Sequence, residues 1–384
     1  MARHGTFAYT WDLVGDPAAA DRIAGLGVDT VTLQAVYHSV RAVTPFHPAH
    51  RVVHAEHAAA YFPVREERWA GQRLRPRTPD WGVPDDDRFG TAAAALTSAG
   101  LRVEAWLVLT HSSAIGATAP ELTVHNAFGE RYPYALCPAH PAVREYALTL
   151  IDEVCAHYDV PALMLEACGW LGFDHGSHHE KTSGADLSDT GRALLSVCLC
   201  LACRTGLVDH GVDPARLAAD IRLAVDRELR TGRPAGDTLA DAIGADRAWA
   251  LHQHRTNTIA GLLRSATALA GEREVLLMVA DDPQVTGPDV GVDLTTFPAP
   301  ADAFVLKCWG AEDPAVAQVK AAAERTAAPV VANVTALEDH PDTLTTRVGR
   351  LLAAGARQIR YYHAGLASPA RLKAVRDAVH GEEP

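Results

Sequence analysis

The stretch 160–181 joins an apolar run to residue types that bind and transform small molecules. Residues 162–165 read Ala-Leu-Met-Leu, which is typical of a strand buried on both faces in a parallel sheet. Glu166 follows directly, and a carboxylate is costly to bury there unless a partner or a reaction uses it. Trp170 and His175 then stand in a Gly-rich segment. The pattern predicts one wall of a small-molecule site. The alternative is a structural glutamate paired with an arginine of a neighbouring strand.

Other predicted strands also end in polar or aromatic residues. Carboxylates beside Trp, Tyr, His and Asn suit a carbohydrate, because aromatic faces stack on sugar rings and polar groups bond the hydroxyls. Two carboxylates that flank a glycosidic bond supply an acid and a nucleophile or base. The catalytic candidates are Glu166, Asp281 and Asp282. The substrate-binding candidates are Trp11, Asp12, Gln34, His38, His111, His125, Asn126, Trp170, His175, Lys307, Trp309, Asn333, Tyr362 and His363.

The elements that must position these residues follow a strand–helix rhythm. Short apolar runs lie at 7–12, 29–38, 101–109, 162–166, 274–280, 303–309, 329–334 and 358–363. Helical periodicity separates most of them, which predicts parallel βαβ units. Eight such units predict an α/β fold of the (β/α)₈ TIM-barrel type, in which the strand ends share one rim.

We expect a single barrel domain over 1–384. The helical pattern over 183–270 is too long for one crossover helix, so it predicts an insertion or subdomain after the fourth strand. Long loops are expected after the second and third strands, at 39–82 and 112–136, and loops of this length are usually functional or disordered. Residues 283–302 show no good helix.

Composition narrows the classes of function. The net charge is −12 and no basic run occurs, which argues against nucleic acid or an anionic membrane surface as a partner. The N-terminal residues show no signal-peptide core, and no apolar run has membrane length, so we expect a cytoplasmic protein. A small carbohydrate is the expected partner, and assembly into a homo-oligomer stays open.

Two clusters of metal-ligating residue types need an interpretation. Cys198, Cys200 and Cys203 stand in a strongly apolar stretch that reads as one helix, which favours core thiols over a metal or cluster site. The run His175, His178, His179 and Glu180 matches no structural zinc spacing. We therefore expect no bound metal and no cofactor.

Lys307 offers a different chemistry. A buried strand lysine with a lowered pKa forms Schiff bases in barrel aldolases. The alternatives for Lys307 are an ion pair with Glu166 or Asp281, or a hydrogen bond to a sugar hydroxyl.

The segment Leu136-Cys137-Pro138, followed by Pro141-Ala-Val-Arg-Glu-Tyr, resembles a motif of bacterial glycosyl-hydrolase-like barrels. In those proteins a similar helix leads into a fourth strand that ends in a catalytic carboxylate. The likeness is strongest over 100–175. In the broad group related to α-amylase-type barrels, the fourth-strand carboxylate is the nucleophile and a fifth-strand residue is the acid. The resemblance thus implies Glu166 as nucleophile and Asp281 or Asp282 as acid. This chain departs from the group at both positions: the fourth strand carries Glu where Asp is usual, and the fifth carries Asp where Glu is usual.

A second large group of barrel glycosidases uses the fourth-strand Glu as acid/base and a nucleophile after the seventh strand. Only Glu338 and Asp339 lie near that position here, so the roles stay open. The predicted function is glycoside hydrolysis, or a related transfer, on a small soluble saccharide or glycoconjugate. The alternatives are a Lys307 aldolase or lyase, a metal-dependent hydrolase, and a sugar-binding barrel without turnover.

The long loops predict where the larger aromatic residues lie, because loops after barrel strands belong to the catalytic face. We expect Trp69 or Trp81, Tyr132, Trp170 and Trp309 to line the same cavity as Glu166.

Overall fold

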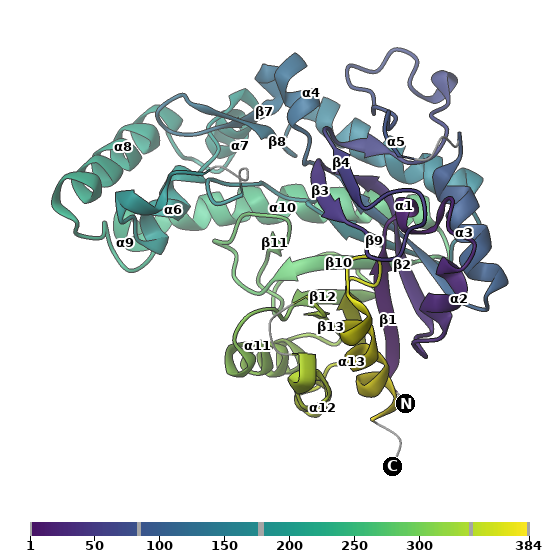
Figure 1. Ribbon diagram of the computed structural model, residues 1–384. Helices are drawn as coiled ribbons and strands as arrows, with labels where there is room; N and C mark the ends of the chain where they lie inside the picture. The colour runs from purple at the N-terminus through teal and green to yellow at the C-terminus, as the bar shows by residue number, and fades with distance from the viewer. Residues whose placement is uncertain (1, 83–85, 176–179, 338–340, 382–384) are drawn as a thin grey trace.

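Eight parallel strands close into a barrel in the computed structural model, which describes residues 2–82, 86–175, 180–337 and 341–381 (Figure 1). In barrel order these strands are β1 (Arg3–Ala8), β2 (Thr30–Tyr37), β6 (Arg102–Val108), β9 (Ala162–Glu166), β10 (Glu274–Ala280), β12 (Ala303–Lys307), β13 (Val330–Thr335) and β14 (Gln358–Tyr362). The pairing of β1 with β2 closes the ring. The predicted TIM-type barrel is confirmed.

The first predicted strand extends too far. β1 ends at Ala8, and residues 10–13 form the helical turn α1 (Thr10–Leu13). The Asp12 carboxylate accepts a hydrogen bond from the Tyr9 backbone N–H at 2.8 Å, and the Gln34 side chain accepts one from the Thr10 N–H at 3.0 Å. These bonds satisfy the free donors of a helix start, so the chain turns here instead of continuing as a strand.

Helices follow most strands and cover the barrel. They are α2 (Ala19–Ala24), α3 (Arg88–Ser98), α4 (Ser113–Thr118), α5 (Pro141–His157), α11 (Glu312–Arg325), α12 (Leu344–Ala353) and α13 (Pro369–His380). Between β10 and β12 no helix occurs among the described residues, as the sequence indicated, and a short strand β11 (Val290–Gly291) extends the edge of β10 instead. No helix in the described ranges is both long and apolar enough to cross a membrane.

The segment after β9 forms the arm seen at the left of Figure 1. It comprises α6 (Asp189–Leu195), α7 (Leu201–Asp209), α8 (Pro214–Thr231), α9 (Leu239–Ile243) and α10 (Ala245–Ala270). α6 to α9 share a hydrophobic cluster separate from that of the barrel. α10, with 26 residues, is about 39 Å long at 1.5 Å per residue, and it packs against both α9 and α5. Whether the arm is a subdomain in its own right stays a prediction.

The two long loops carry small sheets. β3 (Val40–Val43) and β4 (Val52–Ala55) form one hairpin, and β5 (Ala59–Ala60) pairs with β2. β7 (Thr123–His125) and β8 (Arg131–Leu136) form another hairpin between α4 and α5. Short 3₁₀ turns lie at Glu66–Arg68, Pro120–Leu122, Ser183–Ala185 and Pro341–Thr343.

A charged pair fills the middle of the barrel. Arg360 on β14 donates to Glu104 on β6 at 2.7 Å, and both side chains are fully buried. The Thr32 hydroxyl donates to the same carboxylate at 2.9 Å. Gly5 on β1 makes room for the guanidinium, since a Cβ there would lie 2.8 Å from the Arg360 Cδ. This layer forms the floor under the strand ends.

Candidate active site

Glu166 is the last residue of β9, and its side chain is almost enclosed at the barrel mouth, with 6% exposed. Its Oε2 accepts a hydrogen bond of 2.7 Å from the Trp106 indole N–H of β6. The pKa of Glu166 is raised from an ordinary 4.5 to about 8: burial is the largest cause and nearby Asp289 adds to it, while Trp106 and Lys307 act in the opposite direction. A carboxyl group with this pKa is largely protonated at neutral pH.

Asp289 is the second carboxylate of the site, and no pattern in the sequence predicted it. It stands directly before β11, and the Ala167 N–H donates to the Pro288 carbonyl at 2.8 Å, so the segment around Asp289 is tied to the residue after Glu166. Burial raises the pKa of Asp289 to about 6, and Lys307 opposes the shift. Its Oδ1 is buried without a partner among the described residues. The two carboxylates therefore differ in pKa and lie within each other's field.

Three tyrosine hydroxyls meet beside Glu166. The Tyr9 hydroxyl bonds to that of Tyr37 at 3.0 Å and to that of Tyr362 at 2.9 Å. Tyr37 and Tyr362 are the last residues of β2 and β14, so both reach the mouth. The ring of Trp106 contacts those of Tyr9 and Tyr37 at centroid distances of 6.1 and 4.6 Å. The group forms an aromatic wall with a polar edge.

Trp309 extends this wall beside Tyr362, and Lys307 lies over the Trp309 ring. The Lys307 ammonium lies 4.4 Å from the centre of the Trp309 ring, and that ring lies 4.9 Å from Tyr362. The Asn333 side-chain oxygen accepts a bond of 3.4 Å from the Trp309 indole N–H. Lys307 is exposed, unlike the lysine in an apolar pocket that a Schiff-base aldolase needs.

A row of imidazoles forms a further part of the rim. His38 lies 4.5 Å from His111 between ring centres, and His111 lies 4.7 Å from His175. The pKa of His111 is well below its usual value because of burial first, and because of His38 and His175 second. Burial, followed by Lys307, also lowers the pKa of His175. Neutral imidazoles such as these donate and accept hydrogen bonds at neutral pH.

Asp281 and Asp282 lie just past β10, but their contacts lead away from Glu166. The register pairs Leu276 with Met164 and Leu277 with Leu165, so odd-numbered positions of β10 face the surrounding helices. Asp281 is also odd-numbered and therefore faces the helices. Its carboxylate pairs with Arg325 of α11 at 2.7 Å. Asp282 is exposed and accepts a bond from the Gln284 backbone N–H.

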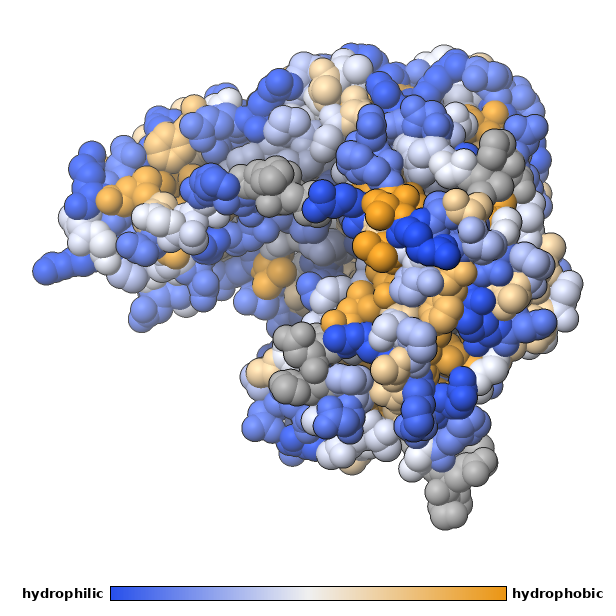
Figure 2. Space-filling view, viewed as in Figure 1, coloured by the Kyte–Doolittle hydropathy of each residue, from blue (hydrophilic) through white to orange (hydrophobic). Residues whose placement is uncertain are grey.

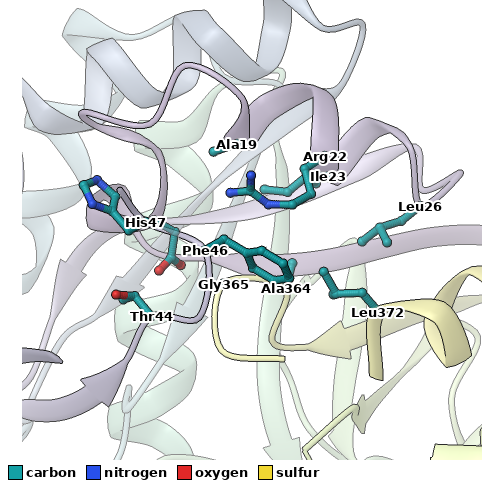
Figure 3. A pocket seen from close by; sticks show the side chains of 11 residues that line it. Ala19, Arg22, Ile23, Leu26, Thr44, Phe46, His47, Ala364, Gly365 and Leu372 are labelled. Atoms are coloured by element: carbon teal, nitrogen blue, oxygen red, sulfur yellow. The ribbon is translucent and has the colours of Figure 1, made fainter. Parts of the chain in front are cut away.

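Four other candidates are held in place by contacts with α1, Tyr61 or Tyr9. Gln34 and Asp12 fix α1, as described above, and Trp11 packs edge-on against Tyr61. The His363 ring packs at a tilt against the Tyr9 ring, with 4.1 Å between the ring centres, and burial lowers the pKa of His363 to about 3. The cavity beside Asp12 measures about 10 Å³, enough for a single water molecule and no substrate (Figure 3).

The remaining candidates lie further out. His125 and Asn126 belong to the β7–β8 hairpin, where the Asn126 side chain bonds to Phe128 and Glu130 and shapes the turn. Together they line a separate cleft between this hairpin and α8. Trp170 packs near His254 of α10.

Of the aromatic residues expected to share the cavity of Glu166, Trp309 lies in the aromatic wall. Tyr132 stacks on Tyr134, whose ring meets His111. Trp69 is elsewhere: it donates to Glu153 of α5. Trp81 packs against His57 and Tyr61 in the loop after β2.

His178, His179, Glu338 and Asp339 lie outside the described residues. The alternative nucleophile after the seventh strand is therefore not located.

No family model and no curated protein matches the chain. Solved structures do. The glycoside hydrolase domain of PgaB (BpsB) from Bordetella bronchiseptica aligns with a TM-score of 0.58 and 16% identity over 99% of both chains. α-L-Fucosidase isoenzyme 2 from Paenibacillus thiaminolyticus gives 0.56 and 15%, over 99% of this chain and 49% of the other. A β-galactosidase from the psychrophilic Marinomonas ef1 gives 0.59 and 9%, over 98% and 59%.

The chain thus spans the whole of the first of these structures and about half of the other two. At these identities the similarity concerns the fold. The resemblance to glycosyl-hydrolase-like barrels is confirmed at that level.

Proposed function

We propose that the chain is a glycoside hydrolase whose catalytic pair is Glu166 and Asp289. The observation that carries the proposal is that these two carboxylates share the barrel mouth with raised but different pKa values, about 8 and about 6. Pairs of titratable groups whose surroundings separate their pKa values mark acid and base roles. The fold, shared with glycoside hydrolases, supports the same chemistry.

Glu166 takes the acid role in this proposal. Trp106 holds one carboxyl oxygen, which leaves the other to carry the proton toward the leaving-group oxygen. Asp289, ionised above about pH 6, attacks the anomeric carbon or activates water. This assignment reverses the nucleophile role that the resemblance implied for Glu166, and it replaces Asp281 and Asp282 as partners.

The substrate class follows from the wall. Trp309 and Tyr362 offer ring faces to a sugar, while the tyrosine hydroxyls and neutral imidazoles offer hydrogen bonds to its hydroxyl groups. A small saccharide or glycoconjugate is the ligand that these groups suit best.

The test is a panel of chromogenic aryl glycosides with wild-type protein, Glu166→Gln and Asp289→Asn. We expect turnover to fall by a factor on the order of a thousand or more in both variants, because each removes one half of the acid–base pair. The wild-type pH profile should be bell-shaped: activity should rise near pH 6, where Asp289 loses its proton, and fall near pH 8, where Glu166 loses its proton.

Asp281→Asn is the matched control, since it changes the same kind of group on the neighbouring strand end. It should lose its pair with Arg325 and keep turnover. A variant of Asp281 that is inactive, beside an active Asp289→Asn, would return the pair to Glu166 and Asp281. A Lys307 aldolase would instead be labelled by borohydride in the presence of a carbonyl substrate.

A further inference from the structure

Four cysteines from two distant parts of the chain meet in one place. The Sγ atoms of Cys137, Cys198, Cys200 and Cys203 all lie within 4.8 Å of one another, and all four side chains are buried. The Cys137 Sγ lies 3.4 Å from that of Cys203, 3.5 Å from that of Cys200 and 3.9 Å from that of Cys198.

These distances fit one tetrahedral ion. Four thiolates about 2.3 Å from a zinc ion stand about 3.8 Å from each other, which is the edge of the tetrahedron. A covalent disulfide is excluded at 3.4 Å or more, and all four are free thiols. Sulfur ligands in this geometry select zinc or iron among the metals that proteins use.

The sequence interpretation of these residues as one apolar helix was wrong. α6 ends at Leu195, and Cys198 lies in the extended segment before α7, where the Leu199 N–H donates to the His125 carbonyl at 2.7 Å. Cys200 is the N-cap of α7, and Cys203 lies in its first turn. The extended segment turns Cys198 toward the other thiols, which a continuous helix would not do.

The surroundings suit a charged centre. The N-terminal end of α7 favours a thiolate at Cys200. Arg255 is buried nearby, where its guanidinium donates to the Ser196 carbonyl, two residues before Cys198, at 3.2 Å. Zinc held by four thiolates has a net charge of −2, which a buried guanidinium offsets in part.

We propose that Cys137, Cys198, Cys200 and Cys203 bind one structural zinc ion that fastens the arm to the barrel. Cys137 follows β8 and precedes α5, whereas the other three belong to the junction of α6 and α7, and Figure 1 shows α7 beside the β7–β8 hairpin. Binding releases the thiol protons to solvent, and no group changes its oxidation state. The proposal is independent of the catalytic pair.

The test is elemental analysis of full-length protein that carries no histidine tag and is purified from zinc-supplemented cells. We expect about one zinc per chain, released when a mercurial reagent blocks the thiols and detected with a chromogenic chelator. Cys198→Ser/Cys200→Ser should contain zinc only at background. Cys155→Ser, which changes a cysteine on α5 outside the cluster, should keep it.

The melting temperature of the wild type provides a second readout, which does not depend on whether the cysteine double variant folds. A strong chelator should lower the Tm of the wild type and of Cys155→Ser, and added zinc should restore it. Wild-type protein without zinc after reconstitution would overturn the proposal, as would iron in its place with visible absorption. A mass two hydrogens below the reduced chain, showing a disulfide, would overturn it as well.

Discussion

Glu166 is a residue whose position works against the stability of the fold. Its carboxyl is almost enclosed, and burial is the largest cause of its raised pKa. A folded-state pKa above the unfolded value means that the folded protein holds this proton more tightly. The contribution to stability is therefore complete below about pH 4.5 and is lost as the pH rises through about 8. An uncharged group of the same shape would avoid that loss.

We accordingly predict that Glu166→Gln melts above the wild type at pH 9 and close to it at pH 5. The upper bound on the difference is on the order of 5 kcal/mol, which corresponds to the rise of the pKa of Glu166 from 4.5 to about 8. Calorimetry at both pH values measures it. If Glu166 were instead the partner of a cation that stabilises the fold, the variant would melt earlier at both.

The residues of the site differ in how well they could be predicted from the sequence. Glu166 interrupts an apolar strand, so pattern alone finds it. Asp289 stands in a segment without periodicity, and only the bond from Ala167 to Pro288 brings it to the mouth. Cys137 is more than sixty positions from its three partners, and no local spacing connects them.

At the scale of the elements, the strands were predictable because each is an apolar run between turn residues. All eight observed barrel strands overlap the predicted runs. The error at the end of β1 has a tertiary cause: Gln34 of β2 takes the Thr10 N–H, and no pattern within residues 7–12 records that partner.

The pair of Arg360 and Glu104 couples β14 to β6 across the barrel. We predict that Glu104→Gln lowers the free energy of unfolding by about 3–5 kcal/mol, because it leaves a buried guanidinium without its counter-charge. Denaturant titration measures the loss.

The double variant Glu104→Leu/Arg360→Met should recover most of that stability, since it removes both charges and fills the space with apolar atoms. A double variant less stable than Glu104→Gln would show that the pair is not a simple charge balance.

At the scale of the molecule, the barrel and the arm have separate hydrophobic clusters. α10 belongs to both parts, and the cysteine cluster is a second link. The surface does not follow this division: Figure 2 shows apolar patches among hydrophilic ones on the arm as well as an apolar strip over the barrel.

If the cysteine link holds a metal, its removal should loosen the arm before the barrel. We predict that limited proteolysis of chelator-treated protein cuts first between 180 and 240, while zinc-loaded protein resists at the same protease concentration. Mass spectrometry of the fragments locates the cuts. First cuts within β10 to β14 would contradict the division.

The buried layer of Arg360 and Glu104 has a consequence for how a ligand enters and leaves the barrel. It closes the barrel beneath the aromatic wall, so within the described residues a ligand held beside Glu166 enters and leaves at the barrel mouth. A product must therefore leave through the same opening by which the next substrate enters. Product release and substrate entry then depend on the same opening. A product that dissociates slowly would occupy the site and act as a competitive inhibitor.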